Sequence, residues 1–241
     1  MPRGDVLYVR SGDDEATVLA AAGLGGIGPL AHDSVAGDPD AIGRFALRGP
    51  LIMLLAAGAR PVAVTGTVSV AGDPLGHGIL AGVRAEADAA GIGADAVLGA
   101  TAEDVATAAT GVGVTVVGIA RLGELRAGSA RAGDTVYLVG RPRSAPGDVL
   151  RLDDEELLTV PAVRALLALP RLRELLPVTS TGVAAGVAAV AGATTVERRD
   201  AWPVADDQSG GPSTACLVAG DADPAAIAEA TGLPVWPLAD L

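Results

Sequence analysis

The sequence contains neither lysine nor asparagine, so its 17 basic side chains are all arginines, set against 29 carboxylates. The absence of lysine excludes a Schiff-base mechanism and the Gly-Lys-Ser/Thr loop of Walker-type phosphate binding. It also excludes the lysine and asparagine pair of protein kinases. A protein of this composition that handles phosphates must therefore use backbone amides, arginine and a metal ion.

Other residue types are scarce as well. The net charge of −12 is opposite in sign to that of a nucleic-acid binder, so no nucleic-acid partner is expected. Cys216 is the one cysteine, which excludes an intramolecular disulfide and fits a reducing compartment. Two histidines, His32 and His77, are too few for a three-histidine zinc site. No apolar run reaches membrane-spanning length, and the first residues lack the apolar segment of a signal peptide, so we expect a cytoplasmic protein without a membrane partner.

The pattern of strands and helices changes along the chain. Up to about Pro142 the two alternate, which is typical of an α/β domain. The turn-rich segment 143–148 then indicates a boundary, which predicts domains at 1–142 and 143–241, the second of the α+β class. Strands are predicted at 6–9, 62–70, 94–98, 112–122, 134–140, 193–196, 214–219 and 234–238. Helices are predicted at 38–58, 74–90, 154–169, 171–176, 182–191 and 223–232.

The first segment that could carry chemistry is Gly25-Gly-Ile-Gly28 with the following His32-Asp33. Closely spaced glycines let the backbone approach phosphate oxygens, and Asp33 could hold a divalent metal. A Gly-rich connection with an ordinary turn aspartate explains the same residues, and in a chain with 33 glycines it is the more economical interpretation. We expect Asp33 rather than His32 to be functional, because adjacent side chains on an extended chain point to opposite sides.

A second candidate segment is Gly99-Ala-Thr-Ala-Glu-Asp104, which follows a predicted buried strand, where α/β folds place ligand loops. Thr101 offers a hydroxyl, and Glu103 and Asp104 offer carboxylates for a metal. The alternative, equally supported by these residues, is a helix start with Thr101 as its N-cap.

A third segment, Ser209-Gly-Gly-Pro-Ser213, precedes the strand that contains Cys216. Its amides and hydroxyls could bind a substrate phosphate, although a plain turn is the simpler interpretation. Cys216 lies within an apolar run and has no evident histidine partner, which favours a buried small side chain over a nucleophile.

Taken in order, these segments resemble the aminoimidazole-ribonucleotide synthetase superfamily over most of the chain. That group includes thiamine-monophosphate kinase, selenophosphate synthetase, a hydrogenase maturation protein and formylglycinamidine synthetase. Residues 23–30 look like its glycine-rich segment, and His32-Asp-Ser-Val35 stands at the place of its aspartate motif. Residues 55–61 (LAAGARP) match the following helix, and residues 98–103 (LGATAE) resemble its "GGxTxE" loop.

The resemblance implies an N-terminal α/β domain that contributes strands to a β-barrel shared by two copies, followed by a shortened α+β domain. It also implies ATP and Mg²⁺ as cofactors and a small-molecule substrate. Asp33 and Glu103 are then the expected catalytic residues, with Asp104 as a further metal ligand. The expected nucleotide-binding residues are Gly25, Gly26, Gly28, Gly99, Thr101 and Arg60. The expected substrate-binding residues are Ser209, Gly210, Gly211 and Ser213.

Two departures from the family pattern affect the expected metal site. Met53 stands where several members have an acid, and the segment Val178-Thr-Ser-Thr-Gly-Val183 lacks the acids that commonly open the second domain. The loop at residues 98–103 is shorter than in the synthetase. This loop and residues 55–61 look closest to the alpha-ribazole kinase branch, which implies phosphorylation of a ribosyl hydroxyl. The alternative is a catalytically silent, nucleotide-binding or structural relative. If the site is active, Arg44, Arg48 or Arg60 could offset phosphoryl charge, although a solvated helix face is the more economical interpretation of each.

Overall fold

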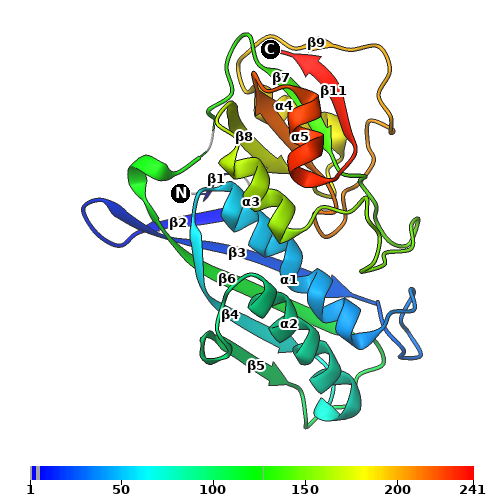
Figure 1. The fold of residues 1–241 in the computed structure, drawn as a ribbon. Coiled ribbons are helices and arrows are strands. Elements are labelled where there is room, and N and C mark those ends of the chain that lie inside the picture. The colour runs from blue at the N-terminus through cyan, green and yellow to red at the C-terminus, as the bar shows by residue number, and fades with distance from the viewer. Residues whose placement is uncertain (1, 4–5, 127) are drawn as a thin grey trace. The chain divides into compact units, whose positions relative to one another are not determined.

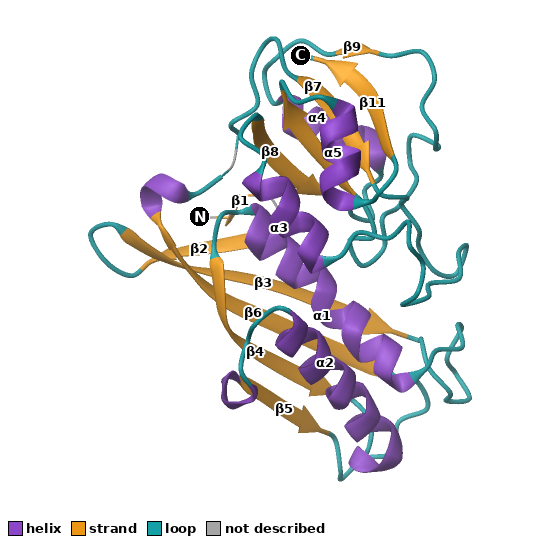
Figure 2. Cartoon of the chain, in the orientation of Figure 1, coloured by secondary structure: helices purple, strands orange, loops and turns teal. Residues whose placement is uncertain are grey.

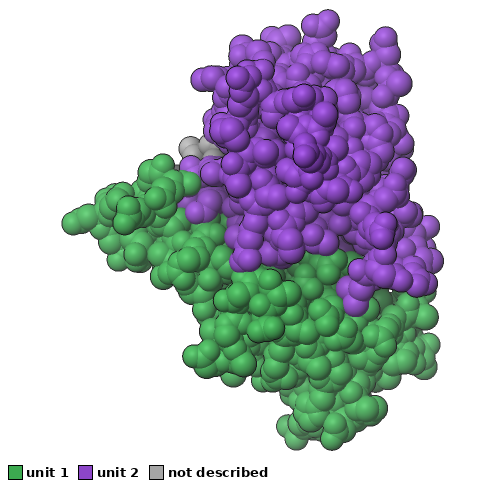
Figure 3. Space-filling model, in the orientation of Figure 1, with its two compact units in different colours: residues 1–54, 59–124 green, residues 55–58, 125–241 purple. Residues whose placement is uncertain are grey.

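The computed structural model describes residues 2–3, 6–126 and 128–241. The chain forms two compact units, residues 1–54 with 59–124 and residues 55–58 with 125–241 (Figure 3). The division follows Glu124, whereas the sequence analysis placed it after Pro142. The difference arises because strand β7 (Thr135–Val139) pairs with strands of the second unit on both sides.

The first unit consists of a six-stranded sheet and two helices (Figures 1 and 2). The strands are β1 (Pro2–Arg3), β2 (Val6–Arg10), β3 (Glu15–Gly25), β4 (Arg60–Val68), β5 (Val97–Thr101) and β6 (Gly111–Arg121). The helices are α1 (Pro39–Ala56) and α2 (His77–Ala89), with short helical turns at Gly72–Gly76, Ala94–Ala96 and Leu122–Glu124. The sheet order is β1-β2-β3-β6-β4-β5.

The first sheet is antiparallel except for the β4–β5 pair, so the expected α/β alternation is corrected to a mixed α+β arrangement. Strand β3, which the sequence analysis did not anticipate, accounts for much of the difference. Alanine and glycine make up much of β3 and are weak strand formers. Here Gly23 and Gly25 lie opposite Gly113 and Gly111 of β6, so pairing along the whole of β6 decides the conformation.

Helices α1 and α2 cover one face of this sheet and cross each other at two glycines (Figure 1). A Cβ at Gly43 would lie 2.0 Å from the carbonyl oxygen of Ile79, and a Cβ at Gly82 would lie 2.1 Å from that of Asp40. The two backbones are therefore in direct contact, and neither position has room for a side chain.

The opposite face of the sheet carries no helix of the first unit among the described residues. Leu7, Val9 and Leu98 on this face are 46%, 47% and 69% exposed. Half-buried residues continue the face across the central strands, where Leu19 lies opposite Val117. Exposed apolar side chains that form a continuous patch commonly mark an interaction surface.

The second unit is a five-stranded antiparallel sheet with helices on both faces (Figure 1). Besides β7, its strands are β8 (Leu172–Pro177), β9 (Glu197–Arg198), β10 (Cys216–Gly220) and β11 (Val235–Asp240), in the order β8-β10-β7-β11-β9. Its helices are α3 (Val160–Ala168), α4 (Val183–Ala191) and α5 (Pro224–Thr231). Val183, Val187 and Val190 of α4 pack against Leu138 and Leu217 of the sheet to form a core.

Local signals predicted the helix ends of this unit better than its strands. Asp223 caps α5 by accepting a hydrogen bond from the Ala225 amide (2.9 Å), and Gly232 ends the helix in the left-handed conformation, as expected. The helix predicted at 171–176 is instead β8, because pairing with β10 overrides the helix preference of its leucines. The helix predicted from 154 begins at Val160, where Thr159 accepts from the Ala162 amide, and the strand expected at 193–196 is replaced by β9.

Arg48 of α1 and Glu86 of α2 form a buried ion pair. The Arg48 Nε donates to Glu86 Oε1 (2.7 Å) and Nη2 donates to Oε2 (3.2 Å). The side chains are only 9% and 7% exposed. Arg48 was expected to offset phosphoryl charge, but Glu86 already neutralises its guanidinium.

In the described part of the chain, no helix has both the length and the apolar character needed to cross a bilayer.

We expect Glu86→Ala to lower the free energy of unfolding by about 3 kcal/mol, because it leaves the Arg48 guanidinium buried without a counter-charge. Asp88→Ala, the same truncation at an exposed carboxylate of the same helix, should change it by no more than about 0.5 kcal/mol. Urea unfolding followed by circular dichroism measures both. Equal losses in the two variants would contradict the assignment.

Candidate active site

The strand register brings the two first-unit motifs to one edge of the sheet. Gly25, the last residue of β3, lies opposite Gly111, the first residue of β6. Val112 of β6 lies opposite Val68, the last residue of β4, and Val68 lies beside Thr101, the last residue of β5. With about 4.8 Å between neighbouring strands, the loops after β3, β4 and β5 leave the sheet in one row. We call this row the loop edge.

Asp33 holds the loop after β3 in place through three hydrogen bonds. Its Oδ1 accepts from the Thr110 amide (2.7 Å), and its Oδ2 accepts from the Thr110 hydroxyl (2.7 Å) and the Leu30 amide (2.8 Å). Partial burial opposes ionisation, but these bonds outweigh it and hold the pKa of the Asp33 carboxyl below its ordinary value. Oδ1 retains one lone pair, so Asp33 could bind a cation through a single oxygen.

The glycines of the same loop serve its own geometry. The Gly26 amide donates to the Thr110 carbonyl and the Gly28 amide donates to the Val35 carbonyl, each at 2.9 Å. A Cβ at Gly28 would lie 2.6 Å from Asp33 Oδ2, so glycine is required for the close approach of Asp33 to Thr110. The amides of Gly26 and Gly28 are therefore already paired, whereas Gly25 lies at the exposed end of β3.

Glu103 lies just after β5 at the other end of the loop edge. Its Oε1 accepts hydrogen bonds from the Gly72 amide (3.1 Å) and from the Thr101 hydroxyl. Asp104 is exposed beside it. Gly99 belongs to the strand itself, where a Cβ would lie 2.9 Å from Leu80 of α2, so its small size serves helix packing. Thr101 ends β5 and does not cap a helix.

The segment between β5 and β6 joins the two halves of the loop edge. The Thr107 hydroxyl donates to the Ser69 carbonyl (2.7 Å), and the His32 amide donates to the Ala108 carbonyl (2.9 Å). The same segment ends in Thr110, the partner of Asp33. Asp33 and Glu103 therefore lie at opposite ends of the loop edge, and the segment that follows Glu103 is hydrogen-bonded to the loops after β3 and β4.

The structure adds two residues that the sequence analysis did not assign to the site. His77 Nδ1 lies 2.8 Å from Asp73 Oδ1 in the turn between β4 and α2, beside Glu103 and Gly72. The signal in the sequence is the spacing of four residues between an aspartate and a histidine at a predicted helix start. Composition alone gave no reason to prefer this histidine to His32.

The structure places one candidate arginine far from the loop edge and pairs another with a carboxylate. Arg60 is the first residue of β4 and lies opposite Ile119, at the end of the strand remote from Val68. Over nine residues of strand this separates Arg60 from the loop edge by roughly 26 Å. Arg44 pairs with Asp40 (2.7 Å).

The expected substrate-binding residues belong to the second unit and form a tight turn. The Gly210 amide donates to the Thr179 carbonyl (3.2 Å), and the Gly211 amide donates to the Ser209 hydroxyl oxygen (3.1 Å). Ser213 is fully buried with φ of 60°, and its hydroxyl has no hydrogen-bond partner in the described part of the chain. The amides of Gly210 and Gly211 are therefore both used within the turn, and the Ser213 hydroxyl is left without a hydrogen bond.

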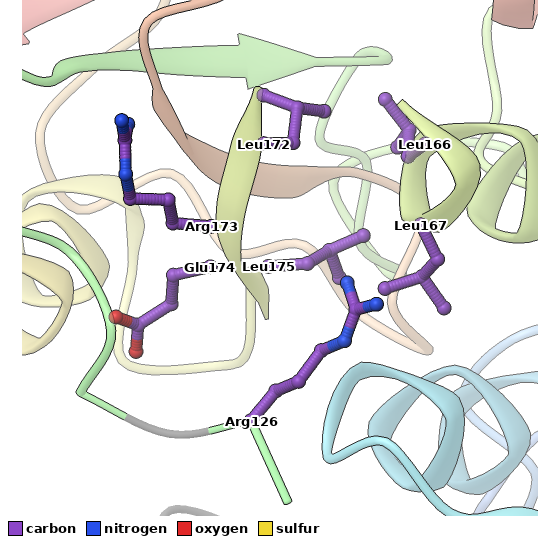
Figure 4. Close-up of a pocket in the computed structure, with 7 residues that line it drawn as sticks. All are labelled: Arg126, Leu166, Leu167, Leu172, Arg173, Glu174 and Leu175. Atoms are coloured by element: carbon purple, nitrogen blue, oxygen red, sulfur yellow. The ribbon is translucent and has the colours of Figure 1, made fainter. Parts of the chain in front are cut away.

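Two other features do not form ligand sites. The hollow lined by Leu166, Leu172, Leu175, Arg126 and Arg173 is shallow and encloses no space for even a water molecule, so it is not a ligand pocket (Figure 4). Burial in β10 raises the pKa of the Cys216 thiol far above its ordinary value, which makes the group inert. Within the ranges described, no three His, Cys, Asp or Glu side chains come together to hold a metal ion.

Comparison with known proteins places this architecture in a fold class. No protein-family model and no curated protein matches the sequence. Among solved structures, thiamine-monophosphate kinase from Aquifex aeolicus matches 98% of this chain and 88% of its own, with a TM-score of 0.65 and 14% identity. The enzyme from Stenotrophomonas maltophilia K279a matches 99% of this chain and 89% of its own, with a TM-score of 0.64 and 20% identity. PurL of Thermotoga maritima complexed with ATP matches 97% of this chain and 41% of its own (TM-score 0.65, 16% identity).

The chain, a mixed α+β protein with two sheets, shares the fold of these solved structures. They include thiamine-monophosphate kinase, which the sequence resemblance named, so the resemblance is confirmed at the level of the fold.

We expect Thr110→Val to raise the pKa of Asp33 toward its ordinary value, because the variant removes one of three donors. Since the folded-state pKa lies below the unfolded one, ionised Asp33 stabilises the loop fully above about pH 4, and this contribution is lost as pH falls through the folded-state pKa. Carboxyl-detected NMR titration measures the shift. Thr107→Val removes a neighbouring hydroxyl that does not touch Asp33 and should leave the titration unchanged. An unaltered midpoint in Thr110→Val would show that the hydroxyl is not responsible.

Proposed function

We propose that the protein catalyses ATP- and Mg²⁺-dependent phosphoryl transfer to a small nucleoside-like or ribose-phosphate-like metabolite. The observation that carries the proposal is the loop edge, where hydrogen bonds fix Asp33 at one end and Glu103 at the other. The fold supports it, because solved neighbours include PurL complexed with ATP and a thiamine-monophosphate kinase complexed with AMPPCP and TMP. Phosphoryl transfer depends on positioning and charge neutralisation, and neither needs lysine.

The oxygen donors present at the loop edge fit Mg²⁺. The ion commonly keeps several waters and binds through one or two carboxylates together with substrate phosphates. Glu103 uses Oε1 for Gly72 and Thr101, which leaves Oε2 for a cation, and Asp104 lies next to it. A Mg²⁺ bound by Glu103 and Asp104 would neutralise phosphate charge. Asp33 lies at the other end of the loop edge, three strand spacings or roughly 14 Å away, so its Oδ1 would contact a different cation on the same nucleotide.

The other expected site residues also have proposed roles. Gly25 and Thr101 flank the loop edge and would contact the nucleotide, with Gly26 and Gly28 shaping the loop. The turn at 209–213 of the second unit would bind a substrate phosphate through its partly exposed residues Ser209 and Gly211, since Ser213 is buried. The acceptor chemistry that we favour is the alpha-ribazole kinase type, a ribosyl hydroxyl. A cytoplasmic location is part of the proposal, since the one cysteine is a buried free thiol.

The open face of the first sheet supports a homodimer. It presents Leu7, Val9 and Leu98 to solvent, and a second copy would cover the same residues by two-fold symmetry. Two such sheets packed face to face would form the shared β-barrel that the resemblance implies. The cost of exposing this face in a monomer favours the proposed dimer.

We expect the wild type to bind Mg-ATP and to melt at a higher temperature in its presence. Glu103→Gln and Asp33→Asn should each weaken Mg-ATP binding at least about tenfold, equivalent to about 1.4 kcal/mol, because each removes a carboxylate charge. The loss should disappear when binding of ATP is measured with EDTA. Isothermal titration calorimetry gives the affinities, and Asp88→Asn, an exposed carboxylate on α2, is the matched control.

Wild-type protein that neither binds Mg-ATP nor shifts its melting temperature would overturn the enzyme proposal. It would leave the alternative of a silent structural relative, which Met53 in place of an acid and the acid-free segment 178–183 would then explain.

For the dimer, we expect Val117→Arg to give a monomer, because a guanidinium at the centre of the open face cannot be buried unpaired. Arg84→Glu, an exposed charge change on α2, should leave the dimer intact. Light scattering coupled to size-exclusion chromatography measures the mass. A wild-type protein that is monomeric at every concentration would refute the shared barrel.

A further inference from the structure

Asp73 and His77 form a dyad whose orientation is fixed by the turn that carries them. Asp73 lies in the turn Gly72–Gly76, and His77 is the first residue of α2. Their side chains meet with Nδ1 of His77 2.8 Å from Oδ1 of Asp73. A ring N–H at Nδ1 donates to this carboxylate, which leaves the lone pair on Nε2. Carboxylate-oriented histidines of this kind serve as proton acceptors in many active sites.

Nε2 is the atom of the dyad that faces the candidate metal and nucleotide residues. A Cβ placed on Gly72 would lie 2.9 Å from His77 Nε2 and 3.0 Å from Glu103 Oε1, so these two atoms lie within about 6 Å of each other. The Gly72 amide donates to Glu103 Oε1 (3.1 Å), which fixes the carboxylate on its side of the turn. The ring nitrogen and the carboxylate therefore converge on one point of the loop edge.

The dyad is accessible to a substrate. The His77 side chain is 62% exposed and that of Asp73 is 88% exposed. An exposed pair of this kind contributes little to folding stability, so stability alone does not account for a histidine held beside Glu103. In contrast, the three hydrogen bonds on Asp33 commit that carboxylate to its own loop.

We propose that His77, positioned by Asp73, accepts the proton from the acceptor substrate, and that this substrate is therefore an alcohol. The inference rests on the proposed phosphoryl transfer. In the step, Nε2 takes the hydroxyl proton while the hydroxyl oxygen forms a bond to the γ-phosphorus of ATP. The bond from that phosphorus to the β,γ-bridging oxygen breaks, ADP leaves with the electron pair, and the imidazolium later returns its proton to water. A phosphate monoester already carries an oxyanion near neutral pH and would need no such base.

The charges around the ring suit this role. Asp73 lies on its own turn, and Glu103 and Asp104 lie on the segment after β5. Asp38 and Asp40 lie at the start of α1, which packs against α2 where a Cβ at Gly78 would meet Pro39 at 2.9 Å. Arg44 neutralises Asp40 (2.7 Å), so the carboxylates that would stabilise the positive charge gained by the ring are chiefly those of Asp73, Glu103 and Asp104.

Ring NMR tests the dyad without any acceptor substrate. Because the chain has two histidines, a long-range ¹H–¹⁵N spectrum contains two rings, and His77→Gln assigns them. We expect the neutral His77 ring to carry its proton on Nδ1 in the wild type and to lose this preference in Asp73→Asn. Addition of Mg²⁺ with a non-hydrolysable ATP analogue should change the chemical shift of Nε2 in this ring, because the nucleotide complex arrives beside it.

Kinetics tests the role in catalysis. ATP consumption is measured with two panels, ribosyl alcohols and phosphate monoesters. We expect His77→Gln to lower kcat with alcohols roughly 100-fold and to bind Mg-ATP within about twofold of wild type. Asp73→Asn should lower kcat less, while Asp88→Asn, at the other end of α2, should behave as wild type.

The outcomes separate the two levels of the proposal. If His77→Gln turns over alcohols as fast as the wild type, the role of His77 is overturned and phosphoryl transfer still stands. The same conclusion follows if the wild type prefers phosphate monoesters and the variant keeps that preference. Failure of the wild type to bind Mg-ATP would remove both. If no alcohol in the panel reacts, the spectra decide, because a ring protonated on Nε2 or unresponsive to the Mg-nucleotide overturns the inference.

Discussion

The pairing of β6 on both of its sides is the interaction on which the first unit depends. All 11 residues of β6 lie opposite residues of β3, and most of them also lie opposite β4. Because this double pairing aligns the ends of β3, β4 and β5, three loops that are distant in sequence leave the sheet in one row. A register slip of one residue would turn the apolar face outward and would separate Thr110 from Asp33.

The charge of the loop edge gives the proposed reaction a particular character. Asp33, Asp73, Glu103 and Asp104 are all anionic, while Arg60 lies at the far end of β4 and Arg48 is paired with Glu86. A triphosphate alone would meet repulsion there. The same carboxylates would attract a nucleotide whose phosphates already carry Mg²⁺. The selectivity proposed for the metal–nucleotide complex over free ATP follows from this charge arrangement, in a chain that has no lysine to offset it.

How much the sequence could predict differs between kinds of feature. Helix ends with strong local chemistry were predictable, as Asp38 shows by capping α1 with a hydrogen bond from the Ala41 amide (3.2 Å). Strand β3 and strand β8 were not, because alanine, glycine and leucine carry no strand preference and only long-range pairing decides their conformation. The grouping of Asp33 with Thr110 likewise depends on a register 77 residues apart in sequence. Motif order indicated correctly which solved proteins share the fold, because it does not depend on such local preferences, although the α/β class expected for the first domain was wrong.

The single thiol in β10 has a practical consequence. Cys216 lies on a fully buried strand flanked by β7 and β8, so a thiol reagent reaches it only when the second sheet opens. The chain has no other cysteine and no lysine, so the rate of alkylation reports on a single residue in a single unit. The rate at which Cys216 is modified under native conditions therefore measures opening of the second unit, independently of any motion of the loop edge.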